Sequence, residues 1–201
     1  MLKKSILMAV LMALAAAVPA LAQSLSAAQM NIYYGHPKTV TMTNQQGTVI
    51  TELDRQGRVT QVTQGNMRMT YAWSDDGKSV EMSMYQGQNF VDSGTIEILE
   101  FTPARYKYNI GGTTEVTVDF RPNGSMEKMT MVNPQMTGTM TYYYNSDDDM
   151  YPCAIEQEAG GQSMKVAMTI EGTDHHGNLT AYSGELMGNK QVTTQTIEYY
   201  E

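Results

Sequence analysis

Apolar and polar residues alternate along most of this chain, and a period of two restricts the secondary structure it can form. In Met67-Arg-Met-Thr-Tyr-Ala-Trp73 the large apolar side chains occupy every second position. Successive side chains of a β-strand point to opposite sides, so we predict one half-buried strand here. The same spacing recurs at Val80/Met82/Met84, Ile96/Ile98, Tyr106/Tyr108/Ile110, Val116/Val118/Phe120, Met129/Met131, Met140/Tyr142/Tyr144, Met164/Val166/Met168/Ile170 and Ile197/Tyr199. Most of the chain is therefore predicted to be strand.

Short turns ending in glycine separate these runs. They are Asn44–Gly47, Asp54–Gly57, Ser74–Gly77, Arg121–Gly124 and Asp174–Gly177, with a weaker copy at Asn145–Asp148. A type I turn prefers Asp, Asn or Ser first, accepts Pro second, as at Pro122, and takes Gly fourth. We therefore interpret the charged segment Leu53–Val62 as structural, with Asp54 capping a turn and Arg58 solvated at the start of the next strand.

Further turn signals lie at residues 64–66, 111–112, 160–161 and 188–189. Together the turns interrupt the chain at intervals that suit antiparallel hairpins and leave no room for crossover helices. Leucine is scarce after residue 22, whereas Thr, Val, Tyr and Met are abundant, as expected for strands. The sequence predicts one all-β domain over residues 23–201, an antiparallel meander of about ten to fourteen strands. The alternation leaves an open curved sheet, a closed barrel and a β-sandwich as alternatives.

The first residues have the three parts of a secretory signal peptide. Lys3 and Lys4 precede an apolar run, and small residues at Ala20 and Ala22 mark a cleavage site. We expect residues 1–22 to be removed and the protein to be periplasmic or secreted. Without the two lysines, 11 basic residues (13 minus 2) face 21 acidic ones, a formal charge of -10. Nucleic acid is therefore excluded as an expected partner.

Residues 53–80, LDRQGRVTQVTQGNMRMTYAWSDDGKSV, resemble the YD repeat of the RHS family. That repeat has an aromatic-Asp pair, two free positions, Gly-Arg, an apolar residue, a later Gly-Asn and a closing Tyr-x-Tyr-Asp. The matching positions are Asp54, Gly57, Arg58, Val59, Gly65, Asn66 and Tyr71 to Trp73, whereas Leu53 and Ser74 depart from the pattern. The family's repeats form a long spiralling sheet of hairpins. The resemblance therefore implies an extended, curved antiparallel sheet, and for this reason we expect the open form.

Methionine pairs on single strand faces are the first candidate site. Met67/Met69, Met82/Met84 and Met129/Met131 each present two thioethers, which favour Cu(I). The same spacing is typical of a core-facing strand, so we interpret these residues as core. Cys153 is the only cysteine, and we expect it to be a buried small residue on a strand beside Ile155.

The other candidates are weaker. His175-His176 fall within a predicted turn and His36 stands alone, a poor arrangement for zinc. Asp147 to Asp149 and Asp75-Asp76 could offer oxygen ligands to calcium, but they lack the spacing of a calcium loop. Glu97 and Glu100 do not define a catalytic pair, and the sequence contains no familiar catalytic motif. We assign no catalytic, cofactor-binding or metal residue.

The sequence thus favours a non-enzymatic envelope or secreted protein that binds an unidentified protein or glycan through one sheet face. Tyr143 must lie opposite Tyr142 and Tyr144 on a strand, so tyrosines are expected on an exposed face. The alternative is a periplasmic β-barrel that binds a small ligand or a metal ion. A transmembrane barrel fits less well, because strands carrying Glu81, Glu97 or Lys107 make a poor lipid-facing surface. We therefore expect no membrane span after signal cleavage.

Overall fold

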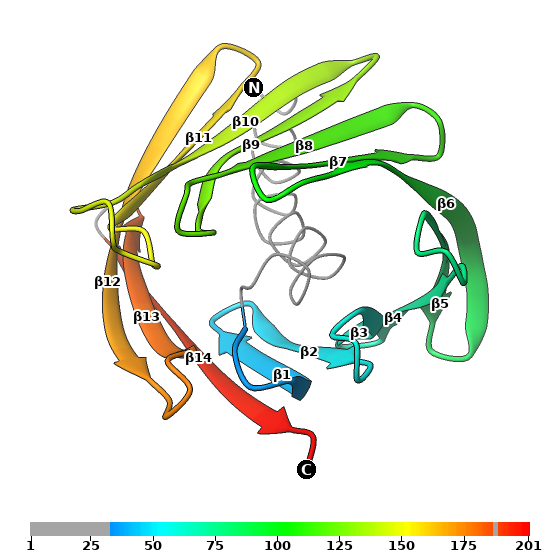
Figure 1. The fold of residues 1–201 in the computed structure, drawn as a ribbon, viewed down its shortest axis with the longest axis horizontal. Helices are drawn as coiled ribbons and strands as arrows, with labels where there is room; N and C mark the ends of the chain where they lie inside the picture. Colours follow the sequence, from blue (N-terminus) through cyan, green and yellow to red (C-terminus); the bar gives the residue numbers. More distant parts are fainter. Residues whose placement is uncertain (1–32, 187–188) are drawn as a thin grey trace.

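A computed structural model describes residues 33–186 and 189–201, and it consists of fourteen strands in a meander (Figure 1). The predicted signal peptide, residues 1–22, lies outside the described residues, as does Gly188 of one predicted turn. The strands are β1 (Pro37–Asn44), β2 (Gly47–Leu53), β3 (Val59–Gln64), β4 (Met67–Trp73), β5 (Ser79–Gln86), β6 (Asn89–Phe101), β7 (Arg105–Ile110), β8 (Thr114–Phe120), β9 (Met126–Asn133), β10 (Met136–Tyr143), β11 (Ala154–Ala159), β12 (Gln162–Thr173), β13 (Leu179–Leu186) and β14 (Asn189–Tyr199). The all-β antiparallel prediction is confirmed.

The sheet closes into a barrel. Each strand pairs antiparallel with the next along the chain, and β1 also pairs with β14, so that Val40 lies between Thr51 on one side and Ile197 on the other. Our preference for an open curved sheet was wrong, and the closed-barrel alternative is correct. Closure pairs the two strands that an open sheet would leave with unsatisfied edges. Local turn chemistry could not reveal this pairing, because it specifies only sequential neighbours.

Glycine-ended turns reverse the chain where the sequence predicts them. In the turn after β2, the Gly57 amide donates to the Asp54 carbonyl at 2.8 Å, and Gly57 has a φ of 75°. Asp54 Oδ1 accepts the amides of Gln56 and Arg58, each at 2.9 Å. Arg58 is not simply solvated, since its Nε lies 2.7 Å from Asp54 Oδ2. The interpretation of this charged segment as structural is therefore confirmed.

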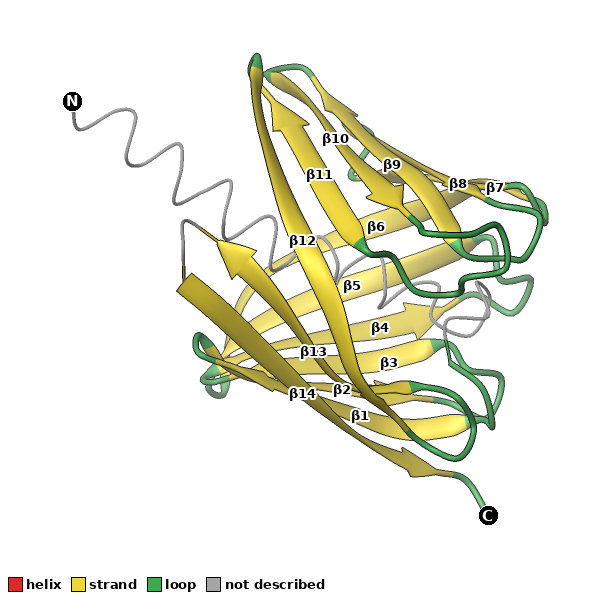
Figure 2. Cartoon of the chain, turned by 90° about the vertical axis from the view of Figure 1, so that its left-hand side faces the viewer, coloured by secondary structure: helices red, strands yellow, loops and turns green. Residues whose placement is uncertain are grey.

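The two ends of the barrel differ in the length of their connections (Figure 2). At one end, which we call the short rim, described turns of two or three residues leave β1, β3, β5, β7, β9 and β11. At the other end, the long rim, the connection after β6 has three residues and those after β2, β4, β8, β10 and β12 have five or more, of which residues 144–153 between β10 and β11 are the longest. The start of β1 and the end of β14 also lie at the long rim. Within the described residues, no helix is long and apolar enough to cross a membrane.

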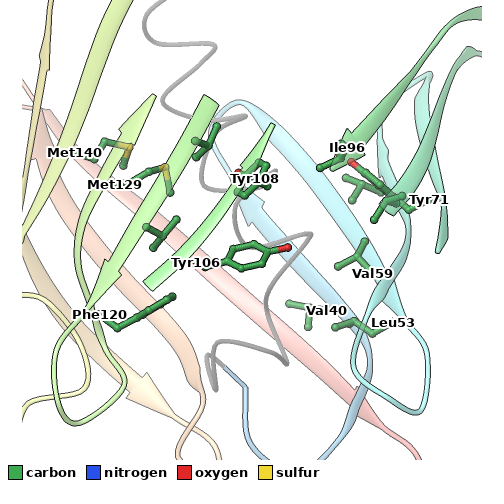
Figure 3. Close-up of a cluster of buried hydrophobic side chains, with 14 of the residues drawn as sticks. Val40, Leu53, Val59, Tyr71, Ile96, Tyr106, Tyr108, Phe120, Met129 and Met140 are labelled. Atoms are coloured by element: carbon green, nitrogen blue, oxygen red, sulfur yellow. The ribbon is translucent and has the colours of Figure 1, made fainter. Parts of the chain in front are cut away.

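Most of the inner face of the barrel is apolar. Tyr106, Val118 and Ile96 are fully buried, and Figure 3 shows such side chains pointing inward from opposite walls. The ladder matches them across strands, for example Val118 with Met129 and Met129 with Met140.

The outer face is mixed. Threonines occupy outward positions on many strands and ion pairs link strands across this face, but exposed apolar side chains such as Ile50, Val132 and Val192 also lie on it. The outward ion pairs are Arg105 with Asp119 at 2.7 Å, Lys107 with Glu115 at 2.9 Å and Lys190 with Glu171 at 2.7 Å. The alternation therefore places most of the large apolar side chains in the lumen and the ion pairs outside.

Candidate functional site

A cavity of about 350 Å³ lies inside the barrel against the inner faces of β10 to β14. Such a volume lies at the lower end of the range found for small-molecule sites. Its described lining residues are Tyr34, Gly124, Ser125, Met126, Met140, Tyr142, Tyr144, Met150, Tyr151, Pro152, Ile155, Gln157, Met164, Val166, Met168, Leu179, Tyr182, Gly184, Gln191, Thr193 and Gln195. The cavity thus uses the inner face of one side of the barrel and reaches the long rim.

Apolar side chains on alternate positions form most of the cavity wall. Met164, Val166 and Met168 of β12 all point inward, and their neighbours on β11 include Ile155, which is paired with Val166. Methionine adapts its shape to irregular partners more easily than branched residues do. Gly184 of β13 lies opposite Met168 and adds no side chain to the cavity. The wall is therefore apolar and deformable.

The polar groups of the lining are neutral. Gln157, Gln191, Thr193 and Gln195 project glutamine amides and one hydroxyl, and the described lining contains no Asp, Glu, Lys, Arg or His. Burial raises the pKa of the Tyr182 phenol above its ordinary value, so this hydroxyl stays protonated at neutral pH. The cavity offers hydrogen bonds but no countercharge.

The long connection between β10 and β11 covers the cavity at the long rim. Arg121 fixes it by donating from Nη1 to the Asp149 carbonyl at 3.0 Å and from Nη2 to the Ser146 carbonyl at 2.9 Å. The guanidinium carbon also lies 4.0 Å from the centre of the Tyr144 ring. Three consecutive residues of this connection, Met150 to Pro152, line the cavity. The charged side chain of Arg121, which is not part of the lining, therefore positions neutral residues that face the cavity.

Asn178 ties the segment before β1 to this rim. Asn178 is fully buried, and its Oδ1 accepts the Tyr34 amide at 2.8 Å. Its Nδ2 donates to the Tyr34 carbonyl at 2.9 Å and to the Tyr199 hydroxyl at 2.8 Å. Tyr34 is a lining residue, so one buried amide fixes part of the cavity wall.

Asp174 and Tyr199 complete the same cluster through a short hydrogen bond from the Tyr199 hydroxyl to Asp174 Oδ2. Burial by itself would raise the pKa of Asp174, but hydrogen bonds from Tyr199 and from the backbone of Asn178 and His176 lower it overall. Burial, followed by the bond to Asp174, raises the pKa of Tyr199 to about 12. Both groups are therefore fixed in one protonation state around neutral pH.

The methionine pairs lie mostly in the core, as interpreted. Met129 is 2% exposed, and Met69, Met82 and Met131 pack against the same buried cluster. Met67 differs, because it lies at a strand end and is exposed. Met69 and Met84 are register partners across the β4–β5 ladder, as facing residues of a packed core are.

The remaining candidates do not converge. Across residues 33–186 and 189–201 there is no group of three His, Cys, Asp or Glu side chains arranged to hold a metal ion. Glu97 and Glu100 lie on the outer face, paired in register with Asn109 and Lys107. The ring centres of His175 and His176 are 4.0 Å apart, and those of His176 and Tyr199 are 4.4 Å apart. The side chains of this turn therefore contact one another and the barrel and are not simply solvated. Cys153 is half-buried and precedes β11 instead of lying within a strand, which corrects the expected position.

The exposed tyrosine face expected from the sequence is not a flat platform. Tyr142 and Tyr144 point into the cavity, and Tyr143 points outward as predicted. The Tyr143 hydroxyl, however, donates to Glu156 at 2.5 Å, and Lys165 Nζ lies 3.5 Å from its ring centre. The hydroxyl and the ring of Tyr143 are therefore already in contact with neighbouring side chains.

Sequence reasoning missed the polar side of the cavity. Gln191, Thr193 and Gln195 occupy alternate positions that continue through Ile197 and Tyr199, which were recognised as one face. The signal was available in that spacing. It was overlooked because polar residues at inward positions look like the outward half of an ordinary strand.

No protein-family model matches this sequence, and no curated protein does either. Among solved structures, a porin-like protein from Bacteroides vulgatus aligns with a TM-score of 0.50 and 10% identity, over 83% of this chain and 99% of that one. A porin-like protein from Bacteroides uniformis aligns with a TM-score of 0.34 and 11% identity, over 83% of this chain and 98% of that one. The first likeness supports the barrel fold.

Proposed function

We propose that this chain is a β-barrel protein of a bacterial envelope that holds an uncharged, mainly apolar small molecule inside the barrel. The observation that carries the proposal is the cavity of about 350 Å³, with apolar walls and neutral polar groups. Pockets of this kind, mostly apolar with a few convergent polar groups, are typical of small-molecule sites. This is the ligand-binding alternative raised by the sequence, with an apolar ligand in place of a metal ion.

The charged residues of the outer face support a barrel that works in water. A transmembrane barrel presents an apolar band to lipid and keeps polar residues inside. Here the outer face carries ion pairs such as Lys107 with Glu115, whereas Tyr108 and Val116 face inward at the adjoining positions of the same strands. Charged side chains at the depth of the hydrocarbon would be unfavourable. The predicted signal peptide supports an envelope location.

Binding of a neutral fluorescent apolar probe, N-phenyl-1-naphthylamine, tests the proposal. The processed protein should bind the probe with a saturable rise in fluorescence. Val166→Phe adds a ring to the cavity wall and should weaken binding at least about tenfold, since roughly 1.4 kcal/mol corresponds to that factor. Ala167→Phe is the matched control, because Ala167 is the exposed outward neighbour on the same strand. Equal affinities of both variants, with circular dichroism unchanged, would contradict binding in the cavity.

A pore in the outer membrane is the second candidate, and the shared fold with a porin-like protein favours it. Fractionation of cells that export the full chain separates the two functions. An apolar-ligand carrier should be released with the soluble periplasmic contents. A barrel that stays in the membrane pellet after an alkaline carbonate wash, and that conducts ions in planar bilayers, would instead support the pore.

A further inference from the structure

We propose that Gln195 is the polar anchor of the cavity and that the ligand is a neutral amphiphile whose hydroxyl or amide N–H donates a hydrogen bond to Gln195 Oε1. This inference rests on the proposed function and names the chemical class of the ligand. It predicts an apolar body against the methionine-rich wall and a single uncharged donor directed at β14.

The side chain of Gln195 is unusual for its surroundings. Gln195 is 8% exposed, lines the cavity, and has an Oε1 atom that is buried without a partner in the part of the chain that the structure describes. Buried polar side-chain atoms are normally hydrogen-bonded, and each exception requires an explanation. A ligand that donates a hydrogen bond to this atom explains the exception.

Neighbouring hydroxyls do not replace that donor. Tyr182 directs its hydroxyl to the Met42 sulfur at 3.6 Å, and Met42 is the register partner of Gln195 across the β1–β14 ladder. Thr193 forms its side-chain hydrogen bond with the same Tyr182 hydroxyl. The terminal torsion of a glutamine is broad, so its amide can turn toward a bound group without leaving a favoured rotamer.

The charge of the described lining residues narrows the chemical class of the ligand further. The described lining contains no ionisable acid or base apart from tyrosines, whose pKa values are raised by burial at Tyr142 and Tyr182. The charged residues of β14, Lys190 and Glu198, lie at the alternate positions that face outward. A carboxylate or phosphate in the cavity would therefore be desolvated without a countercharge, which is strongly unfavourable. A fatty alcohol or a similar uncharged lipid satisfies both requirements.

Competition against N-phenyl-1-naphthylamine with three probes of equal chain length tests this assignment. 1-Decanol donates a hydrogen bond, decyl methyl ether only accepts one, and decanoate is charged. The processed wild-type protein should bind decanol about tenfold more tightly than the ether, and decanoate most weakly at neutral pH. This preference for decanol over the ether is the quantity to follow.

Gln195→Met and Gln195→Leu should each abolish the preference while still binding the ether. Thr196→Leu is the control, because Thr196 is the exposed outward neighbour of Gln195 on the same strand, and its variant should keep the preference. Using two Gln195 variants guards against a folding defect in one of them, which thermal unfolding would reveal. A preference that survives in a folded Gln195 variant, or a wild type that binds decanol and ether equally, overturns the anchor. A wild type that binds neither the probe nor any competitor overturns the proposed function itself.

Discussion

Two halves of the barrel wall bury their inner faces in different ways. From β2 to β9 many inward residues are bulky and fully buried, as at Val80, Ile96 and Tyr106, each of which is 0% exposed, and Figure 3 shows Ile96 and Tyr106 among them. From β10 to β14 the inward residues include Met164, Gly184 and Gln191, and they border the cavity. We call these the packed half and the cavity half. Both belong to one continuous ladder, so the difference arises from side chains and not from backbone pairing.

This difference shows how one repeating backbone can combine stability with binding. A barrel wall needs only its hydrogen-bonded ladder and its alternation, so inner residues can vary in size without breaking strand pairing. Branched, aromatic and methionine side chains fill the packed half at high density, whereas Gly184 and the glutamines of β14 leave space in the cavity half. Close packing stabilises the fold, and a region released from it can accept a ligand.

The largest expected effect comes from a matched pair of methionine truncations. Met129→Ala removes a side chain that is 2% exposed in the packed half, and we expect the free energy of unfolding to fall by about 2–5 kcal/mol. Met164→Ala only enlarges an existing cavity, so its loss should stay below about 1.5 kcal/mol. Urea unfolding of the two variants measures the difference. Equal losses would mean that the two halves are packed alike.

The next effect concerns the rim that closes the cavity half. Asn178→Ala removes three hydrogen bonds and leaves the Tyr34 amide and carbonyl without their partner, so the free energy of unfolding should fall by roughly 2–4 kcal/mol. Asn44→Ala is the control. Asn44 accepts one exposed hydrogen bond from the Gln46 amide, so this variant should lower the free energy of unfolding by only about 0.5–1 kcal/mol. Chemical denaturation measures both. If Asn178→Ala cost no more than Asn44→Ala, the buried amide would not hold the rim.

The sequence predicted local features of the fold well. Asp54, Gly57 and Gly124 occupy the turn positions that their side chains and positive φ angles require, and the inward faces of most strands follow the alternation. These features depend on residues close together in the chain. The resemblance to the YD repeat, by contrast, led to an open sheet, and nothing in the structure tests the family relationship itself.

Closure and the cavity could not be predicted in the same way. The contact between Val40 and Ile197 joins the two ends of the domain, and no local pattern specifies it. Arg58 was expected in solvent because its sequence neighbours do not reveal the geometry of its bond to Asp54. Gln195 lies in the lumen only because β14 continues an inward face, and its missing partner appears only when every neighbour is in place. Long-range pairing, not local preference, creates the site.

The smallest expected effect is a pH dependence at the rim of the cavity half. The pKa of Asp174 is lowered in the folded protein, so its stabilising contribution is complete above the unfolded value of about 3.9 and is lost as pH falls through the lower folded value. The pKa of Tyr199 is raised to about 12, so its contribution is complete below about 10 and is lost as pH rises through 12. Asp174 is only partly buried, and solvent screening limits each contribution to less than about 1 kcal/mol.

The hydrogen bond between the two groups contributes to both pKa shifts, but backbone bonds also lower the pKa of Asp174 and burial is the main cause at Tyr199. Asp174→Asn should therefore flatten the acid limb and Tyr199→Phe the alkaline limb, and each should reduce the other limb only in part. The measurement is the unfolding free energy from urea titrations between about pH 2 and pH 12, compared with wild type. The packed half provides the contrast, since Tyr106→Phe removes a buried hydroxyl that has no partner within the described residues and should leave the acid limb unchanged. An acid limb in Asp174→Asn as steep as in wild type would show that the bond to Tyr199 does not stabilise the cavity rim, and that Asn178 alone connects Tyr34 to it.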